Sequence, residues 1–174
     1  EEFDHKHLNL DLPYFTERIP TSENIARVLW DKLDAQRDIG TLQRLSLYED
    51  EDLCADLTAA AGLDVASVTR RYSFTAVHEG HRGHTWDVFV SVHGPIDPET
   101  GMVTDIVALD RLVHDRVLVP FEGRDLRIAL ATPSVTGEYL AKAVWDRIVS
   151  AVPTGRLQLV KLVQTRDLSY EYCG

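Results

Sequence analysis

The sequence predicts an α+β fold in which an antiparallel sheet carries two helices on one face. Two observations lead to this prediction. Strand-like alternation and helix-like spacing follow one another along the chain, and a helix-strand segment recurs 115 residues later. The predicted order is a complete β-β-α-α-β-β unit at 64–174, preceded by an additional α-β-β half unit at 1–63.

The first long helix is expected to begin at Thr21 or Ser22, because either hydroxyl can cap a helix N-terminus. A stripe of apolar residues then recurs at helical spacing, at Ile25, Ala26, Leu29, Trp30 and Leu33. Gly40 follows as a helix-breaking residue. The run 42–48 alternates in polarity and predicts a strand.

The same pattern returns without a gap, and roughly a third of the aligned positions are identical. The matching pairs include Glu23 and Glu138, Ala26 and Ala141, Trp30 and Trp145, Gly40 and Gly155, and Leu47 and Leu162. Agreement at two tryptophans and two glycines indicates duplication. We therefore expect residues 1–63 to be the C-terminal half of a first unit and residues 64–174 to be a whole second unit.

The middle of the chain supplies the elements that the half unit lacks. Residues 68–77 and 86–92 each alternate in polarity and predict two strands of a hairpin. A turn-rich connection follows at 95–101, where Gly101 can adopt a left-handed conformation. Thr104 or Asp105 can then cap a helix with an apolar face.

Composition narrows the function. The chain has 174 residues, 44% of them hydrophobic, and a net charge of -10, which argues against a nucleic-acid surface because phosphate binding needs clustered Lys and Arg. No apolar run approaches the roughly 18 residues of a membrane helix. Cys54 and Cys173 give no disulfide framework, so a cytoplasmic location is the default expectation.

Three histidines, His78, His81 and His84, fall in the turn between the two predicted strands of the hairpin. Histidine is the commonest metal ligand, and the glycines between these residues allow the backbone to bend so that imidazoles can converge. The pattern is therefore a candidate metal site. The alternative is a polar hairpin loop that is rich in histidine.

Several motifs carry a resemblance to a known family. They are the Phe-Thr-Ala-Val-His run at 74–78, Gly-His-Thr-Trp at 83–86, Gly-x-Ile-Asp-Pro-x-Thr-Gly-Met-Val at 94–103 and Asp-His-x-x-Leu-Asn at 4–9. Together they resemble the 6-pyruvoyl-tetrahydropterin synthase and 6-carboxytetrahydropterin synthase family. The resemblance implies a tunnelling fold, in which sheets of neighbouring subunits join into a barrel, and hence a homo-oligomer such as a trimer or hexamer.

In that family three histidines bind Zn²⁺, which makes a substrate C–H acidic, and a loop cysteine acts as the base. An Asp-His pair completes the proton relay, and a glutamate anchors the pterin by accepting two parallel hydrogen bonds. The resemblance makes His78 the first zinc ligand and His84 the last. Arg82 stands at the middle position, and His81 is one residue away.

The second unit departs from the family pattern elsewhere as well. Its loop has no cysteine, and Gln164 stands where the family has its anchoring glutamate. An amide cannot supply the same two acceptor oxygens. The half unit keeps what the second unit lacks, because Asp4 and His5 match the relay pair and Glu49 matches the anchor.

The predicted substrate-binding residues are therefore Glu49, Thr21 and Ser22, although the pattern around the two hydroxyl residues favours the role of helix cap over substrate contact. The zinc histidines of the half unit are expected upstream of Glu1 or on a neighbouring subunit. The resemblance implies a lyase that removes triphosphate from dihydroneopterin triphosphate, in pterin or deazapurine-precursor biosynthesis. The alternative is a tunnelling-fold protein that binds a pterin or purine, or completes a barrel, without catalysis.

Overall fold

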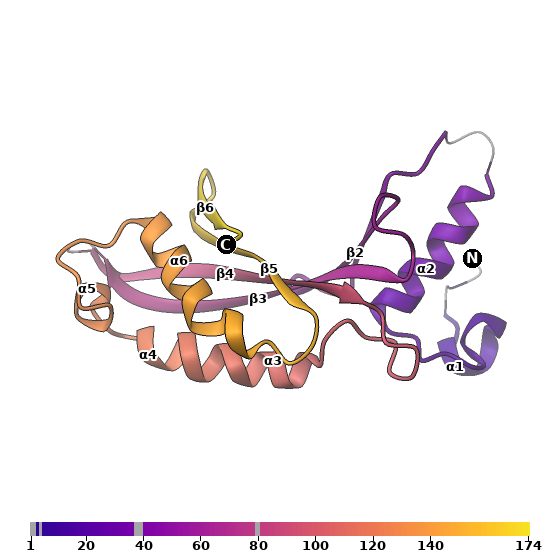
Figure 1. The fold of residues 1–174 in the computed structure, drawn as a ribbon, viewed down its shortest axis with the longest axis horizontal. Coiled ribbons are helices and arrows are strands. Elements are labelled where there is room, and N and C mark those ends of the chain that lie inside the picture. Colours follow the sequence, from indigo (N-terminus) through magenta and orange to yellow (C-terminus); the bar gives the residue numbers. More distant parts are fainter. Residues whose placement is uncertain (1–2, 4, 37–39, 79–80) are drawn as a thin grey trace. The chain divides into compact units, whose positions relative to one another are not determined.

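The computed structural model describes residues 3, 5–36, 40–78 and 81–174, with only the backbone described at 81 and 82. The helical elements are α1 (Leu8–Asp11), η1 (Pro13–Phe15), α2 (Ser22–Asp34), α3 (Ile106–Val113), η2 (His114–Leu118), α4 (Val119–Phe121), α5 (Leu126–Ala129), α6 (Gly137–Ile148) and η3 (Val149–Ala151). The strands are β1 (Arg44–Tyr48), β2 (Leu53–Thr58), β3 (Val65–His78), β4 (His81–Pro95), β5 (Arg156–Thr165) and β6 (Leu168–Tyr172). Figure 1 shows these elements along the chain.

The strands form one six-stranded sheet in sequence order, β1 to β6. The β1–β2 and β5–β6 hairpins are both antiparallel. By contact density the chain divides into a first unit, Glu1–Val68 with His93–Val103, and a second unit, Thr69–Val92 with Thr104–Gly174. The first and second unit of the structure are named by these bounds, which are not those of the predicted repeat. The α+β class predicted from the sequence is confirmed.

The first unit contains α2, the β1–β2 hairpin and the adjoining ends of β3 and β4. Thr21 caps α2 by accepting a hydrogen bond from the backbone N–H of Asn24. Burial along α2 differs in part from the predicted stripe: Ala26 and Trp30 are buried as expected, whereas the other members of the stripe are only partly buried. Val28, outside the stripe, is also buried and packs with Leu12 and Phe15. The N-terminal segment supplies this extra apolar surface.

The second unit has its core between α3, α6 and one face of the sheet. Alternate residues of β3 and β4 point toward the helices, as a period of two requires. The fully buried residues of this core include Phe74, Trp86, Val88, Val90, Phe121, Leu140 and Leu162. Asp105 caps α3 by accepting from the N–H of Ala108, as its position after the turn predicted.

The two predicted copies of the repeat have closely similar local structure. Thr136 caps α6 by accepting from Tyr139 N–H at 3.2 Å, just as Thr21 caps α2 by accepting from Asn24 N–H at 3.2 Å. The hairpin registers also correspond, because Leu47 pairs with Ala55 in the first unit and Leu162 pairs with Tyr170 in the second. Positions 115 apart can therefore be compared directly.

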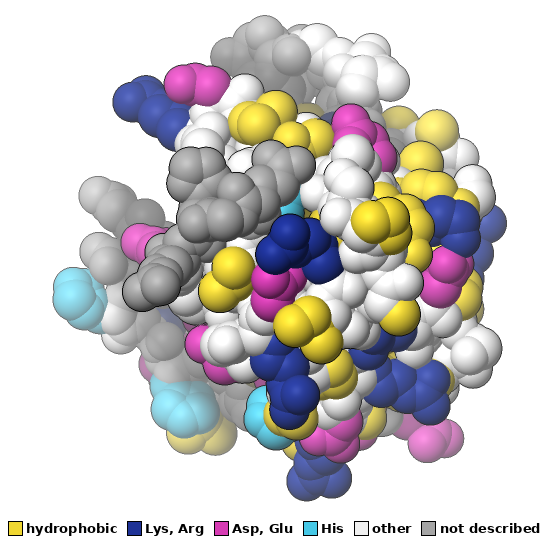
Figure 2. Space-filling model, turned by 90° about the vertical axis from the view of Figure 1, so that its left-hand side faces the viewer, with side chains coloured by type: hydrophobic (Ala, Val, Ile, Leu, Met, Phe, Trp, Pro, Cys, Tyr) yellow, Lys and Arg dark blue, Asp and Glu magenta, His cyan; other side chains and the backbone are white. Residues whose placement is uncertain are grey.

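The surface drawn in Figure 2 carries basic, acidic and hydrophobic side chains in a mixed pattern. Among the described residues, no helix is both long and apolar enough to cross a membrane.

Candidate ligand-binding site

Glu49 is the centre of the candidate site in the first unit. It directly follows β1, and its backbone N–H donates to the carbonyl of Leu53 at 3.0 Å, which fixes it at the start of the β1–β2 turn. Its Oε2 accepts a hydrogen bond from the hydroxyl of Ser22 at 2.7 Å. Ser22 is the first residue of α2, so the carboxylate lies at the helix N-terminus, where the helix dipole favours a negative charge.

Thr21 holds the same helix end to the connection that follows β4. Its hydroxyl accepts from the Asn24 N–H at 3.2 Å and donates to the carbonyl of Gly101 at 2.6 Å. Asn24 in turn donates its side-chain amide to the carbonyl of Ile19 at 2.9 Å. Thr21 is thus a cap and a tether, whereas Ser22 is the residue that contacts Glu49.

Glu23 is buried next to this site, with 5% of its surface exposed. Its Oε1 accepts a hydrogen bond from the N–H of Val103 at 2.9 Å. Burial raises the pKa of Glu23, and the negative charge of Glu49 raises it further. In the sequence Glu23 stood out only as the counterpart of Glu138 in the repeat, and nothing in the local pattern indicated a partner 80 positions away.

The connection that meets α2 is shaped by Asp97 and Gly101. Asp97 Oδ1 accepts from the N–H groups of Glu99 and Thr100 at 2.9 and 2.8 Å, and the bonds from Thr100 chiefly lower the pKa of Asp97. Gly101 has a φ of 73°, the left-handed conformation expected for it. The Gly-x-Ile-Asp-Pro motif therefore builds a rigid turn against the helix end.

The predicted relay pair lies in the N-terminal segment. Asp4 lies outside the described residues. His5 is exposed and has a φ of 54°, an uncommon conformation for a residue other than glycine. The catalytic roles of Asp4 and His5 stay predictions.

The two outer histidines of the predicted metal site pack on the same tryptophan of the second unit. His78 is buried, and its Nε2 lies 2.7 Å from the carbonyl oxygen of Val135. The rings of His78 and His84 contact Trp86 edge-on, with centroids 5.2 and 5.0 Å away. His84 Nε2 and Trp86 Nε1 are buried and have no hydrogen-bond partner among the described residues.

His78 and His84 alone are too few to hold a zinc ion. Protein zinc sites use at least three nitrogen, sulfur or carboxylate ligands. The described part of the chain contains no group of three or more His, Cys, Asp or Glu placed to hold a metal. The hydrogen bond to Val135 also engages a nitrogen of His78. The side chains of His81 and Arg82 lie outside the described residues.

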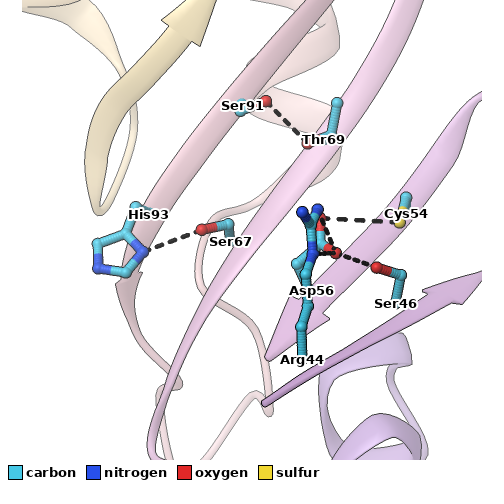
Figure 3. A network of polar contacts seen from close by, with 8 residues as sticks. All are labelled: Arg44, Ser46, Cys54, Asp56, Ser67, Thr69, Ser91 and His93. Atoms are coloured by element: carbon cyan, nitrogen blue, oxygen red, sulfur yellow. Dashed lines mark hydrogen bonds and ion pairs between the residues drawn. The ribbon is translucent and has the colours of Figure 1, made fainter. Parts of the chain in front are cut away.

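Both cysteines, Cys54 and Cys173, are free thiols. Cys54 is buried on β2, and burial raises the pKa of its thiol to about 11, which keeps it protonated at neutral pH. Figure 3 shows it beside Asp56, which also interacts with Arg44 and Ser46 of β1. This thiol is not poised to act as a base.

Comparison with known proteins adds a family to this geometry. A family model described as 6-pyruvoyl tetrahydropterin synthase matches residues 1–60 and 63–174. The 6-pyruvoyl tetrahydrobiopterin synthase of Homo sapiens is 31% identical over 134 residues, which cover 63% of this chain and 92% of that protein. The Drosophila melanogaster protein of the same name is 32% identical over 122 residues, covering 56% of this chain and 68% of that protein.

A solved structure gives the same result for the fold. The Caenorhabditis elegans 6-pyruvoyl tetrahydropterin synthase superposes with a TM-score of 0.56 at 22% sequence identity. The superposition covers 63% of this chain and 96% of that one.

Proposed function

The chain belongs to the 6-pyruvoyl tetrahydropterin synthase family, and from this premise we propose that it binds a pterin at Glu49 and acts as a lyase on dihydroneopterin triphosphate, releasing triphosphate. The observation that carries the proposal is the hydrogen bond from Ser22 to Glu49 at 2.7 Å. This hydrogen bond orients a carboxylate at the end of β1, the position at which the family resemblance implies the pterin anchor.

The chemistry of the anchor follows from the carboxylate group. Its two oxygens can accept parallel hydrogen bonds from the ring N–H and the exocyclic amine of a pterin, and both bonds are strengthened by the negative charge. The Ser22 hydroxyl restricts rotation of the side chain, so less conformational entropy is lost when the ligand binds.

We infer further that residues 1–63 are the C-terminal half of one synthase-like unit and residues 64–174 a second unit. Two separate matches to the family model, at 1–60 and 63–174, support this division. In this arrangement Asp4 and His5 supply the proton relay of the first unit. His78 and His84 pack on Trp86 and are assigned no metal-dependent step.

The proposed assembly is a homo-oligomer. β1 and β6 end the strand order, and an edge strand presents unpaired backbone groups that can extend a sheet into a neighbouring subunit. Light scattering coupled to size-exclusion chromatography tests this proposal. A strictly monomeric chain at micromolar concentration would contradict it.

A second candidate is pterin binding without turnover. It is supported by the second unit, in which the described residues do not fit zinc and Gln164 replaces the anchoring glutamate. The same protein preparation distinguishes the two candidates, because only the lyase releases triphosphate.

The test measures neopterin binding by calorimetry and triphosphate release from dihydroneopterin triphosphate, with and without a chelator. We expect Glu49→Gln to weaken neopterin binding by about 100-fold, since charge-assisted hydrogen bonds contribute about 1.5–3 kcal/mol. Glu17→Gln makes the same change at an exposed carboxylate and should leave binding unchanged. Unaltered binding by the Glu49 variant would overturn the anchor, and binding without triphosphate release would overturn the lyase.

A further inference from the structure

The second unit contains a position-by-position counterpart of the Glu49 site, and it is built differently. Gln164 corresponds to Glu49, and Gly137 corresponds to Ser22 as the first residue of its helix. The hairpin registers make Tyr170 the counterpart of Ala55, because these residues pair with Leu162 and Leu47 respectively. Serine, glutamate and alanine are thus replaced by glycine, glutamine and tyrosine.

The ring of Tyr170 occupies the space that a side chain at position 137 would need. A Cβ atom added at Gly137 would overlap ring atoms of Tyr170, so a serine here is incompatible with the present position of the ring. In the first unit the fully buried Ala55 has no side chain that could extend in this way. The glycine and the tyrosine therefore depend on each other.

The tyrosine hydroxyl also takes up the acceptor at the anchor position. It donates to Oε1 of Gln164 at 3.0 Å, whereas Glu49 Oε2 accepts from Ser22. The ring of Tyr170 also lies near Trp86, with centroids 6.5 Å apart. An aromatic ring with a hydrogen-bond donor is the same combination that a pterin would present to an anchor.

We propose that Tyr170 is an intramolecular occupant of the second unit's anchor site, so that each chain binds one pterin, at Glu49 alone. This inference rests on the proposed function for its choice of ligand, a planar heterocycle with an adjacent ring N–H and amine. The second unit then contributes its helices and strands to the fold while its own site is closed by a residue of the same chain.

The test exchanges the three residues in both directions. Gly137→Ser, Gln164→Glu and Tyr170→Ala together give the second unit the residues of the first. The number of neopterin sites per chain, measured by calorimetric titration, should rise from one in the wild type to two in this variant. In the reverse exchange, Ser22→Gly with Ala55→Tyr should abolish binding at Glu49 although the glutamate is retained. Circular dichroism verifies that each variant is folded.

Two measurements need no exchange of packing residues. Wild-type protein should bind one neopterin per chain, and Glu49→Gln should leave no second site of comparable affinity. Two sites per chain in the wild type would overturn the closed site, and so would a folded triple variant that still binds one. If the wild type binds no neopterin but the triple variant binds one, the proposed binding at Glu49 fails, and closure of the second site by Tyr170 stands.

Discussion

The hydroxyl of Ser22 donates to the carboxylate of Glu49 across 27 positions of sequence, joining the start of a helix to the end of a strand. This bond is made by the half unit itself. The connection after β4 then holds the same helix end through Thr21 and Glu23. The anchor is therefore positioned by two independent sets of contacts.

Removing the hydroxyl of Ser22 should weaken pterin binding without removing the anchor. We expect Ser22→Ala to lower neopterin affinity about tenfold, because a net hydrogen bond contributes about 1–1.5 kcal/mol. Calorimetry measures the effect. Ser150→Ala, at an exposed position, serves as the matched control, and equal affinities in both variants would contradict the role of Ser22.

The two helix caps should differ in their contribution to stability. Thr136→Ala removes only a cap and should lower the free energy of unfolding by about 1 kcal/mol. Thr21→Ala removes a cap and the bond to the Gly101 carbonyl, so we expect about 2 kcal/mol. Urea denaturation compares the two variants. A larger loss for Thr136→Ala would show that the bond to Gly101 contributes nothing.

The buried carboxyl of Glu23 should make stability depend on pH. Its raised pKa means that the folded protein binds a proton more readily than the unfolded chain. The free energy of unfolding should therefore fall as pH rises from the ordinary carboxyl pKa through the raised value, and then level off.

Glu23→Gln removes this dependence, and its amide oxygen can still accept from Val103 N–H. We expect the variant to be at least as stable as the wild type at about pH 7. Urea denaturation between about pH 4 and about pH 8 measures both slopes. The exposed Glu17→Gln variant should keep the wild-type slope, and an unchanged slope in Glu23→Gln would refute the assignment.

A side chain at Gly101 should be costly for two reasons. Its φ of 73° is unfavourable for alanine, and an added Cβ would collide with Asn24 and approach Thr21. Gly62 has a φ of 80° but open space around it. We therefore expect Gly62→Ala to cost about 1 kcal/mol and Gly101→Ala about 2–3 kcal/mol in thermal unfolding. Similar losses would mean that the turn shifts freely.

Sequence reasoning predicted the elements that depend on local chemistry. The family resemblance and the left-handed Gly101 are confirmed. At each helix start one of the two candidate caps is the cap, Thr21 rather than Ser22 and Asp105 rather than Thr104. The periodicity of residues 68–77 and 86–92 gave the hairpin but not its length, because β4 continues from His81 to Pro95 through residues that include three histidines and two glycines.

Packing between residues far apart in the sequence could not be predicted from local sequence patterns. The bond from Val103 to Glu23 and the burial of Val28 involve partners that no spacing rule connects. The sequence indicated, from Gln164 and the loop without a cysteine, only that the second unit departs from the family pattern. The fit of Tyr170 against Gly137 required the register of β5 and β6. The domain boundary near residue 63 and the roles of Asp4, His5 and His81 stay predictions.

The first unit draws on two stretches of chain, Glu1–Val68 and His93–Val103, and this has a consequence for translation. The ribosome makes α2 before its partner, because the N–H from which Glu23 accepts belongs to a residue synthesised 80 positions later. At about 5–20 residues per second, the nascent helix waits several seconds for that partner. The packing of α2 is thus completed only after the chain has passed through β3 and β4.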